Sequence, residues 1–184
     1  ADDTSNKENT TQKDLFVKLC EILPNIRQSI SASHGTLLGN EFHFDMVRPG
    51  IGLYGGIKYN GLKEVIQIKV PVLQDFIIDK NMQVGYNYIF KAKHKMRVAT
   101  LSMGYADGLP RTLSNIGKLF YENIPCPIIG RISMDLVTVD ISNLPKSPRY
   151  LCVFSPEYQV DDFAKDCKSI SHEVLVNLGE RVRR

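Results

Sequence analysis

The chain has 184 residues, of which 43% are hydrophobic and 23% are charged, so it is long enough to bury the core of one domain or slightly more. Its formal net charge of +3 is well below the concentrated positive charge of a dedicated nucleic-acid binder. No apolar run approaches the roughly 20 residues that cross a membrane, and no signal peptide is recognised. Four widely spaced cysteines without a CxxC pair support no zinc site and fit a reducing cytosol, so we expect a cytoplasmic protein without a metal.

The first quarter of the chain has the order of an α/β fold. Apolar residues recur at helical spacing from Thr11 to Leu23, before Pro24, and predict a helix. Short apolar runs predict strands over residues 27–33 and 42–47. Because one helix and two strands cannot close a parallel sheet, this portion is interpreted as the end of a larger α/β domain.

After residues 55–61 the pattern changes to short strands separated by turn residues, which is typical of an antiparallel sheet or barrel. The predicted strands cover residues 65–72, 98–103, 118–121, 126–129, 136–141 and 151–154. Two helices are predicted near the end, over residues 160–167 and 171–178. The second part is therefore predicted to be a mainly antiparallel β-domain.

Two segments place a tyrosine beside a glycine at the end of a predicted strand, where a phenol can point into a cleft. They are Val84–Tyr88 and Gly104–Arg111, and the second reads Gly-Tyr-Ala-Asp-Gly-Leu-Pro-Arg, which is the chemistry of a turn. With its flanks and with the run from His43 to Gly55, this segment resembles alanine racemase, a pyridoxal 5'-phosphate (PLP) enzyme.

The resemblance covers nearly the whole chain but only the C-terminal half of the family. It implies that residues 1–57 are the C-terminal end of a TIM-like (β/α)8 barrel and that residues 58–184 are the alanine racemase C-terminal β-domain. It also implies racemisation of L-alanine to D-alanine for peptidoglycan, in a homodimer whose active site is shared across the interface. The Schiff-base lysine motif of the family does not occur in this sequence. The chain is therefore expected to be a fragment that is inactive alone; whether the N-terminal barrel half is a separate chain or was cut off stays open.

The resemblance assigns five positions to the cofactor. Arg48 matches the arginine that hydrogen-bonds to the pyridine nitrogen; a guanidinium keeps its proton, which weakens the electron sink and disfavours transamination. Ser33 matches a phosphate-binding serine, and Gly50 and Ile51 match backbone positions with the same task. His172 stands where the family has a tyrosine that touches the phosphate and narrows the entrance; histidine also donates hydrogen bonds, but it titrates near neutrality.

The resemblance also assigns the base and the substrate contacts. Tyr86 matches the tyrosine that removes the Cα proton of L-alanine, and a phenol with an ordinary pKa of about 10 needs nearby positive charge for that role. Tyr105, Arg111 and Arg131 match the substrate corridor. Met134 matches the residue whose backbone N–H holds the substrate carboxylate.

Judged from residue type alone, these positions keep structural alternatives. Arg48 could form a structural salt bridge and Ser33 could be an ordinary turn serine. Tyr86 and Met134 could be core side chains.

Two other functions stay open at this point. The basic residues from Lys91 to Arg97 could make the chain a nucleic-acid-binding β module, which would bind with steep salt dependence but has few aromatic residues for stacking. A PLP-dependent amino-acid decarboxylase of similar architecture is the second alternative. Arg48 argues against it, because those enzymes place an acidic residue at the pyridine nitrogen. Alanine is the expected substrate, with serine still possible, and no nucleic-acid or membrane partner is expected.

Overall fold

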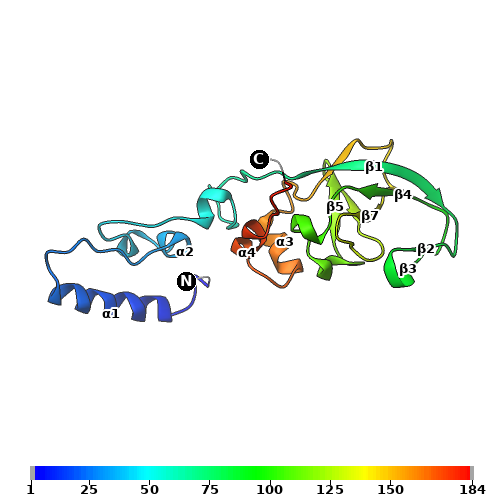
Figure 1. Cartoon of the computed structure of the whole chain (residues 1–184). Helices are drawn as coiled ribbons and strands as arrows, with labels where there is room; N and C mark the ends of the chain where they lie inside the picture. Colours follow the sequence, from blue (N-terminus) through cyan, green and yellow to red (C-terminus); the bar gives the residue numbers. More distant parts are fainter. Residues whose placement is uncertain (1–2, 183–184) are drawn as a thin grey trace. The chain divides into compact units, whose positions relative to one another are not determined.

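The computed structural model describes residues 3–182, and the chain divides into two units between Lys63 and Glu64 (Figure 1). In the described residues of the first unit, helical segments predominate. They are α1 (Glu8–Ile22), α2 (Ser33–Thr36) and two 3-10 helices, η1 (Asn40–Phe42) and η2 (Ile51–Tyr54). Helix α1 begins three positions before its predicted start, because the side-chain oxygen of Asn6 accepts the N–H of Glu8 at 2.9 Å and satisfies a free donor of the first turn.

The two strands predicted over residues 27–33 and 42–47 do not form as continuous strands. The segments still run side by side: Asp45 donates its N–H to the Gln28 carbonyl at 3.1 Å, Arg48 donates to Ser31 at 2.9 Å, and Ala32 and Arg48 form one parallel bridge. Phe44 has a φ of +50°, which interrupts the extended backbone between these contacts. Within the described part of this unit no further strand flanks the pair, so the ladder is not extended on either side.

The second unit is built on an antiparallel sheet with the strand order β6-β5-β8-β1-β4-β7. The strands of the whole unit are β1 (Lys69–Ile78), β2 (Gln83–Val84), β3 (Phe90–Lys91), β4 (Met96–Leu101), β5 (Lys118–Tyr121), β6 (Ile124–Pro127), β7 (Val137–Asp140) and β8 (Tyr150–Cys152). An antiparallel bridge between Ile128 and Val139 joins the two outer strands of the order, and Ile129 donates to the Thr138 carbonyl at 2.9 Å. The sheet therefore closes on itself as a small barrel, which leaves no long free edge.

Short helices connect and cover the barrel. They are the 3-10 helices η3 (Tyr86–Tyr88), η4 (Tyr105–Asp107) and η5 (Arg111–Leu113) and the α-helices α3 (Val160–Asp166) and α4 (Ser171–Val176). Helices α3 and α4 contact each other, as Figure 1 shows. None of the helices in the described residues is long and apolar enough to cross a membrane.

The core of this unit has two parts that together fix the loops at the barrel ends. The larger part fills the barrel and is covered by α3, whose Phe163 ring meets Phe154 edge to face at 5.5 Å between centroids. The smaller part includes Ile78, Met96 and Ile129, and the side chains of Val84 and Phe90 pack against it. Those two residues belong to β2 and β3, so this second cluster anchors the ribbon that carries the Tyr86 turn.

Candidate functional site

Residues of the first unit form a small hydrogen-bonded cradle around Ser33. The Ser33 hydroxyl oxygen accepts the N–H of Gly50 at 2.8 Å and the N–H of Gly52 at 3.1 Å, and its side chain is buried. Two backbone donors therefore converge on one oxygen. A Cβ at Gly50 would meet no atom within 4 Å, so the backbone there faces open space. Converging N–H groups beside a hydroxyl suit a phosphate oxygen.

The predicted phosphate positions lie in this cradle, with one addition. Ile51 is the buried first residue of η2, between the two glycines whose N–H groups meet Ser33. Gly52 was not singled out from the sequence. A signal was present, because Pro49-Gly50-Ile51-Gly52 alternates flexible backbone with an apolar anchor.

Arg48 lies where the segment 42–48 pairs with the segment 28–32, at the backbone bridge to Ala32. Its side chain is exposed, and its guanidinium donates to the Ser29 hydroxyl and, at 3.5 Å, to the Ile30 carbonyl. No carboxylate pairs with it among the described residues, which argues against the structural salt bridge considered above. Since a guanidinium has five N–H donors, these contacts leave donors available for a ligand.

In the second unit, glycines bring together the three loops that carry most of the predicted substrate residues. A Cβ on Gly85 would lie 2.7 Å from the Arg131 backbone nitrogen, and one on Gly130 would lie 2.8 Å from the Val84 carbonyl oxygen. A Cβ on Gly104 would lie only 2.2 Å from the Met134 carbonyl oxygen. Backbones can approach this closely only because the glycine at each contact has no side chain. The loops around Tyr86, Tyr105 and Met134 are therefore held against one another.

Hydrogen bonds lock the same loops. Tyr105 and Ala106 donate their N–H groups to the carbonyls of Ser133 and Met134 at 3.0 and 3.1 Å. The Asn115 side chain accepts the N–H of Gly130 at 2.6 Å and donates to the Ile89 carbonyl at 3.2 Å, so it joins the Arg131 loop to the Tyr86 turn.

Ser114 makes a similar link between the Arg111 turn and the Arg131 loop. Its hydroxyl donates to the Arg111 carbonyl at 2.7 Å and accepts the N–H of Ile132 at 3.1 Å. Sequence reasoning did not single out Ser114 or Asn115. An Asn shortly before Gly117 indicates a turn, and Asn115 does have a φ of +62°, but its long-range partners are visible only in the structure.

The Tyr86 phenol is the most accessible aromatic group at these loops, with 69% of the side chain exposed. Its turn is strained, because Asn87 and Tyr88 both have positive φ angles, of +58° and +52°. Such a backbone is unusual for a bulky residue like Tyr88, and backbone strain concentrates at functional sites. In the described residues the Tyr86 hydroxyl makes no hydrogen bond, so it is free to meet a substrate.

The remaining predicted substrate residues add polar and cationic groups to these loops and to η5. Tyr105 and Met134 are exposed, as is Arg111 on η5. Arg131 is half-buried, and its Nε atom is buried without a hydrogen-bond partner in the described part of the chain. A buried guanidinium N–H without a partner is unusual, because buried donors are normally hydrogen-bonded.

His172 is not brought to these loops by any hydrogen bond or ion pair of the described residues. It is the exposed second residue of α4.

The basic cluster from Lys91 to Arg97 is smaller in the structure than in the sequence. Arg97 is only half-exposed, and its Nη2 atom donates to the carbonyls of Ile141 and Leu144 inside the unit. Lys91, Lys93, His94 and Lys95 are exposed. Arg97 thus has a structural role, which removes one charge from the surface that a nucleic-acid-binding module would need.

Comparison with protein families gives two matches that together span most of the chain. The model described as "Alanine racemase, C-terminal domain" matches residues 65–184, and "Alanine racemase, N-terminal domain" matches residues 1–58.

Individual relatives and solved structures agree. An alanine racemase of Cereibacter sphaeroides is 40% identical over 184 residues, which is all of this chain and 52% of the relative, and one of Jannaschia sp. is 39% identical over 100% and 54%. The crystal structure of alanine racemase from Bartonella henselae with covalently bound pyridoxal phosphate superposes with a TM-score of 0.92, at 38% identity, over 100% of this chain and 53% of that protein. The chain spans about half the length of the curated relatives it matches.

Proposed function

The chain belongs to the alanine racemase family, and from that premise we propose that it supplies half of an active site that interconverts L- and D-alanine with pyridoxal 5'-phosphate. One observation carries the proposal: glycine contacts and hydrogen bonds hold together three loops, which carry Tyr105, Arg131 with Met134, and the exposed Tyr86. We further propose that the two family domains meet near residues 57 and 58, and that the D-alanine serves peptidoglycan synthesis.

The cradle around Ser33 fits the cofactor's phosphate. The Ser33 hydroxyl and the N–H groups of Gly50, Ile51 and Gly52 would hold it, as neutral donors commonly hold a phosphate dianion. Arg48 would donate to the ring nitrogen and, because it keeps its proton, would leave that nitrogen unprotonated. Bound there, pyridoxal phosphate would supply the electron sink that makes the Cα proton of an amino acid acidic.

The second unit would handle the proton and the substrate. Tyr86 would take the Cα proton of L-alanine at its phenolic oxygen and return one in the reverse direction. The backbone N–H of Met134 would hold the substrate carboxylate, while Tyr105, Arg111 and Arg131 would line the approach. His172 would narrow the entrance and contact the phosphate.

Racemisation also needs a group on the opposite face of the substrate Cα. The family's lysine motif does not occur in this sequence, so we propose that an N-terminal barrel half supplies the lysine. We propose that two copies of this chain assemble so that the β-domain of one completes the site of the other. The four cysteines are free, which fits a cytoplasmic location.

The test is complementation. The purified chain is incubated with pyridoxal phosphate and L-alanine, with and without a barrel half from one of the relatives, and D-alanine is measured. We expect racemisation only when both halves are present. D-alanine formation by this chain alone would contradict the lysine assignment. Absence of activity from a complex shown to have assembled would contradict the proposed function.

The role of Tyr86 is tested in the assembled protein with a matched pair of substitutions. Tyr86→Phe removes the proposed base and should lower kcat by about 10²–10⁴-fold, the usual contribution of a general base. Tyr88→Phe removes an equally exposed phenol from the same turn, 67% against 69%, and should leave kcat unchanged. Equal effects of the two substitutions would show that the turn matters and the Tyr86 phenol does not.

A further inference from the structure

The segment after α4 returns along the turn that carries Tyr105. The N–H of Gly179 donates to the Asp107 carbonyl at 3.2 Å. A Cβ on Gly179 would lie 2.5 Å from the Ala106 carbonyl oxygen, and one on Gly108 would lie 2.6 Å from the Asn177 carbonyl oxygen. Backbone therefore lies directly against backbone, and the position of the following residues is set by the Tyr105 turn.

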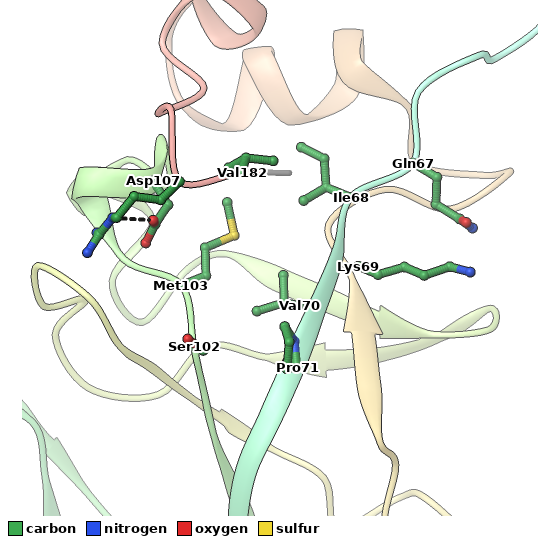
Figure 2. Close-up of a pocket in the computed structure, with 10 residues that line it drawn as sticks. Gln67, Ile68, Lys69, Val70, Pro71, Ser102, Met103, Asp107 and Val182 are labelled. Carbon is green, nitrogen blue, oxygen red and sulfur yellow. Dashed lines mark ion pairs between the residues drawn. The ribbon is translucent and has the colours of Figure 1, made fainter. Parts of the chain in front are cut away.

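From this position the Arg181 guanidinium forms ion pairs with carboxylates on two loops. Its Nε atom lies 3.0 Å from an Asp107 carboxylate oxygen, and its Nη1 atom lies 2.6 Å from an Asp135 carboxylate oxygen. Figure 2 shows the Asp107 pair as a dashed line, with Val182 just beyond it above Ile68 and Met103. The hydrogen bond with Asp135, followed by the charges of both carboxylates, raises the pKa of Arg181 above its ordinary value.

The two carboxylates belong to the loops that carry proposed substrate contacts. Asp107 ends η4, which begins at Tyr105, and its second oxygen accepts the N–H of Gly104 at 2.8 Å. Asp135 directly follows Met134. A planar guanidinium that donates to both carboxylates restricts the distance and the orientation between them.

We propose that Arg181 is a positioning residue that fixes the Tyr105 turn relative to the Met134 loop, and so sets the width of the substrate side of the site. The proposal rests on the proposed function for its consequence but not for its geometry. Since the side chains of Arg181 and Asp135 are 52% and 54% exposed, the ion pairs add little to global stability. The effect of Arg181 is local.

The first experiment measures amide hydrogen exchange in the purified 184-residue chain. Arg181→Ala should speed exchange of the Tyr105 and Ala106 amides about tenfold, because both donate across to the Met134 loop, while amides of β4 and β7 stay unchanged. Arg181→Lys, which keeps the charge but loses the planar fork, should give a smaller increase. Asp135→Ala removes the partner on the Met134 loop and should act in the same direction as Arg181→Ala.

Lys165→Ala is the matched control. It removes a surface ion pair of similar length, 2.7 Å to Asp161, on a helix distant in sequence from both loops. Its Tyr105 and Ala106 amides should exchange as in the unchanged chain. Unchanged exchange at these amides in Arg181→Ala, or a uniform increase across the barrel, would overturn the proposal.

The second experiment uses the complemented racemase. Arg181→Ala should raise KM for alanine about five- to tenfold with a smaller change in kcat, because substrate contacts are displaced while the base is retained. If kcat falls and KM is unchanged, the positioning role is wrong. If the unsubstituted complex does not racemise alanine, the proposed function fails, while the exchange experiment still decides the role of Arg181.

Discussion

At the scale of single residues, Gly85 is the position on which the candidate site depends most directly. It combines a φ of +79°, which an L side chain rarely adopts, with a backbone nitrogen of Arg131 only 2.7 Å from where a Cβ would stand. We predict that Gly85→Ala costs about 1–3 kcal/mol of the free energy of unfolding and displaces the Tyr86 turn. Urea denaturation measures the first effect, and racemisation by the complemented protein measures the second.

Gly61 provides the control for that substitution. It also has a positive φ, of +95°, but a Cβ there would meet no atom within 4 Å. Gly61→Ala therefore tests the backbone conformation without the close contact, and it should cost less than Gly85→Ala. If the two variants were equally stable, the close approach of the two loops would not be a real constraint.

Residue chemistry could be predicted further than residue partners. Glycine next to tyrosine at residues 85–86 and 104–105 indicated accessible phenols, and both side chains are exposed. The sequence could not indicate that Asn115, Ser114 and Arg181 connect those loops, because the bonds that cross between loops join positions at least 15 residues apart in the chain. Polar side chains that act at such a distance follow no local pattern.

At the scale of elements, short strands with turn residues at both ends were predicted well. β5 begins and ends at the predicted residues, 118 and 121. β1 was predicted over residues 65–72 but spans Lys69–Ile78. Its register shifts between Val72 and Gln74, and most residues after the shift are exposed, so the alternation that defines a strand is lost where pairing with β4 continues.

The strands predicted over residues 27–33 and 42–47 did not form, although their residue pattern favours a strand. Residues 29–33 alternate serine with apolar residues and residues 42–47 are largely apolar, but a parallel pair needs neighbours on its flanks. A residue pattern indicates which segments favour a strand. The hydrogen-bonded ladder forms only if other strands lie beside that segment. One bridge, Ala32 to Arg48, is what remains of that pairing in the described residues.

The β5–β6 hairpin contributes a pH dependence through the buried Cys126. Burial raises the pKa of this thiol to about 11, and the charge of Asp140 adds to the rise while a backbone hydrogen bond at Tyr121 opposes it. An unfolded cysteine has a pKa of about 8.5, so between these values the unfolded chain has released a proton that the folded chain retains. We predict that the contribution of Cys126 to the free energy of unfolding is constant below about pH 8 and falls from there to pH 11.

Urea denaturation at a series of pH values tests this prediction. Burial also raises the pKa of Cys152 and, to about 11, that of Cys167, so Cys126→Ala should reduce the slope above pH 8.5 without removing it. Cys20→Ala, on α1 outside the barrel, should leave the slope unchanged. An identical slope in Cys126→Ala and in the unsubstituted chain would mean that the thiol is hydrated in the folded state.

At the scale of the whole molecule, the two units differ in how much of their apolar surface they bury. The second unit buries a continuous core through the barrel and α3. Helix α1 has 15 residues and buries none of them completely, with Leu15, Leu19 and Ile22 exposed. Most helical stability in proteins comes from packing of an apolar face, and an isolated helix of this length is marginal in water. The units should therefore differ in local stability far more than in secondary structure.

Hydrogen exchange on the 184-residue chain should show this difference in local stability. Amides of β4 and β7 should exchange only through global unfolding, whereas those of α1 should exchange through local opening, at least about 10²-fold faster. Helix α3 is the matched control, since it has only 7 residues but buries Val160, Phe163 and Ala164. If helix length determined protection, the α1 amides would exchange more slowly than the α3 amides. We expect the reverse, with the α1 amides exchanging faster than the α3 amides. Exchange of the α1 amides should slow when the barrel half is added, because that half would cover the exposed leucines of α1. Protection of α1 equal to that of the barrel in the chain alone would show that the first unit is stable without a further partner.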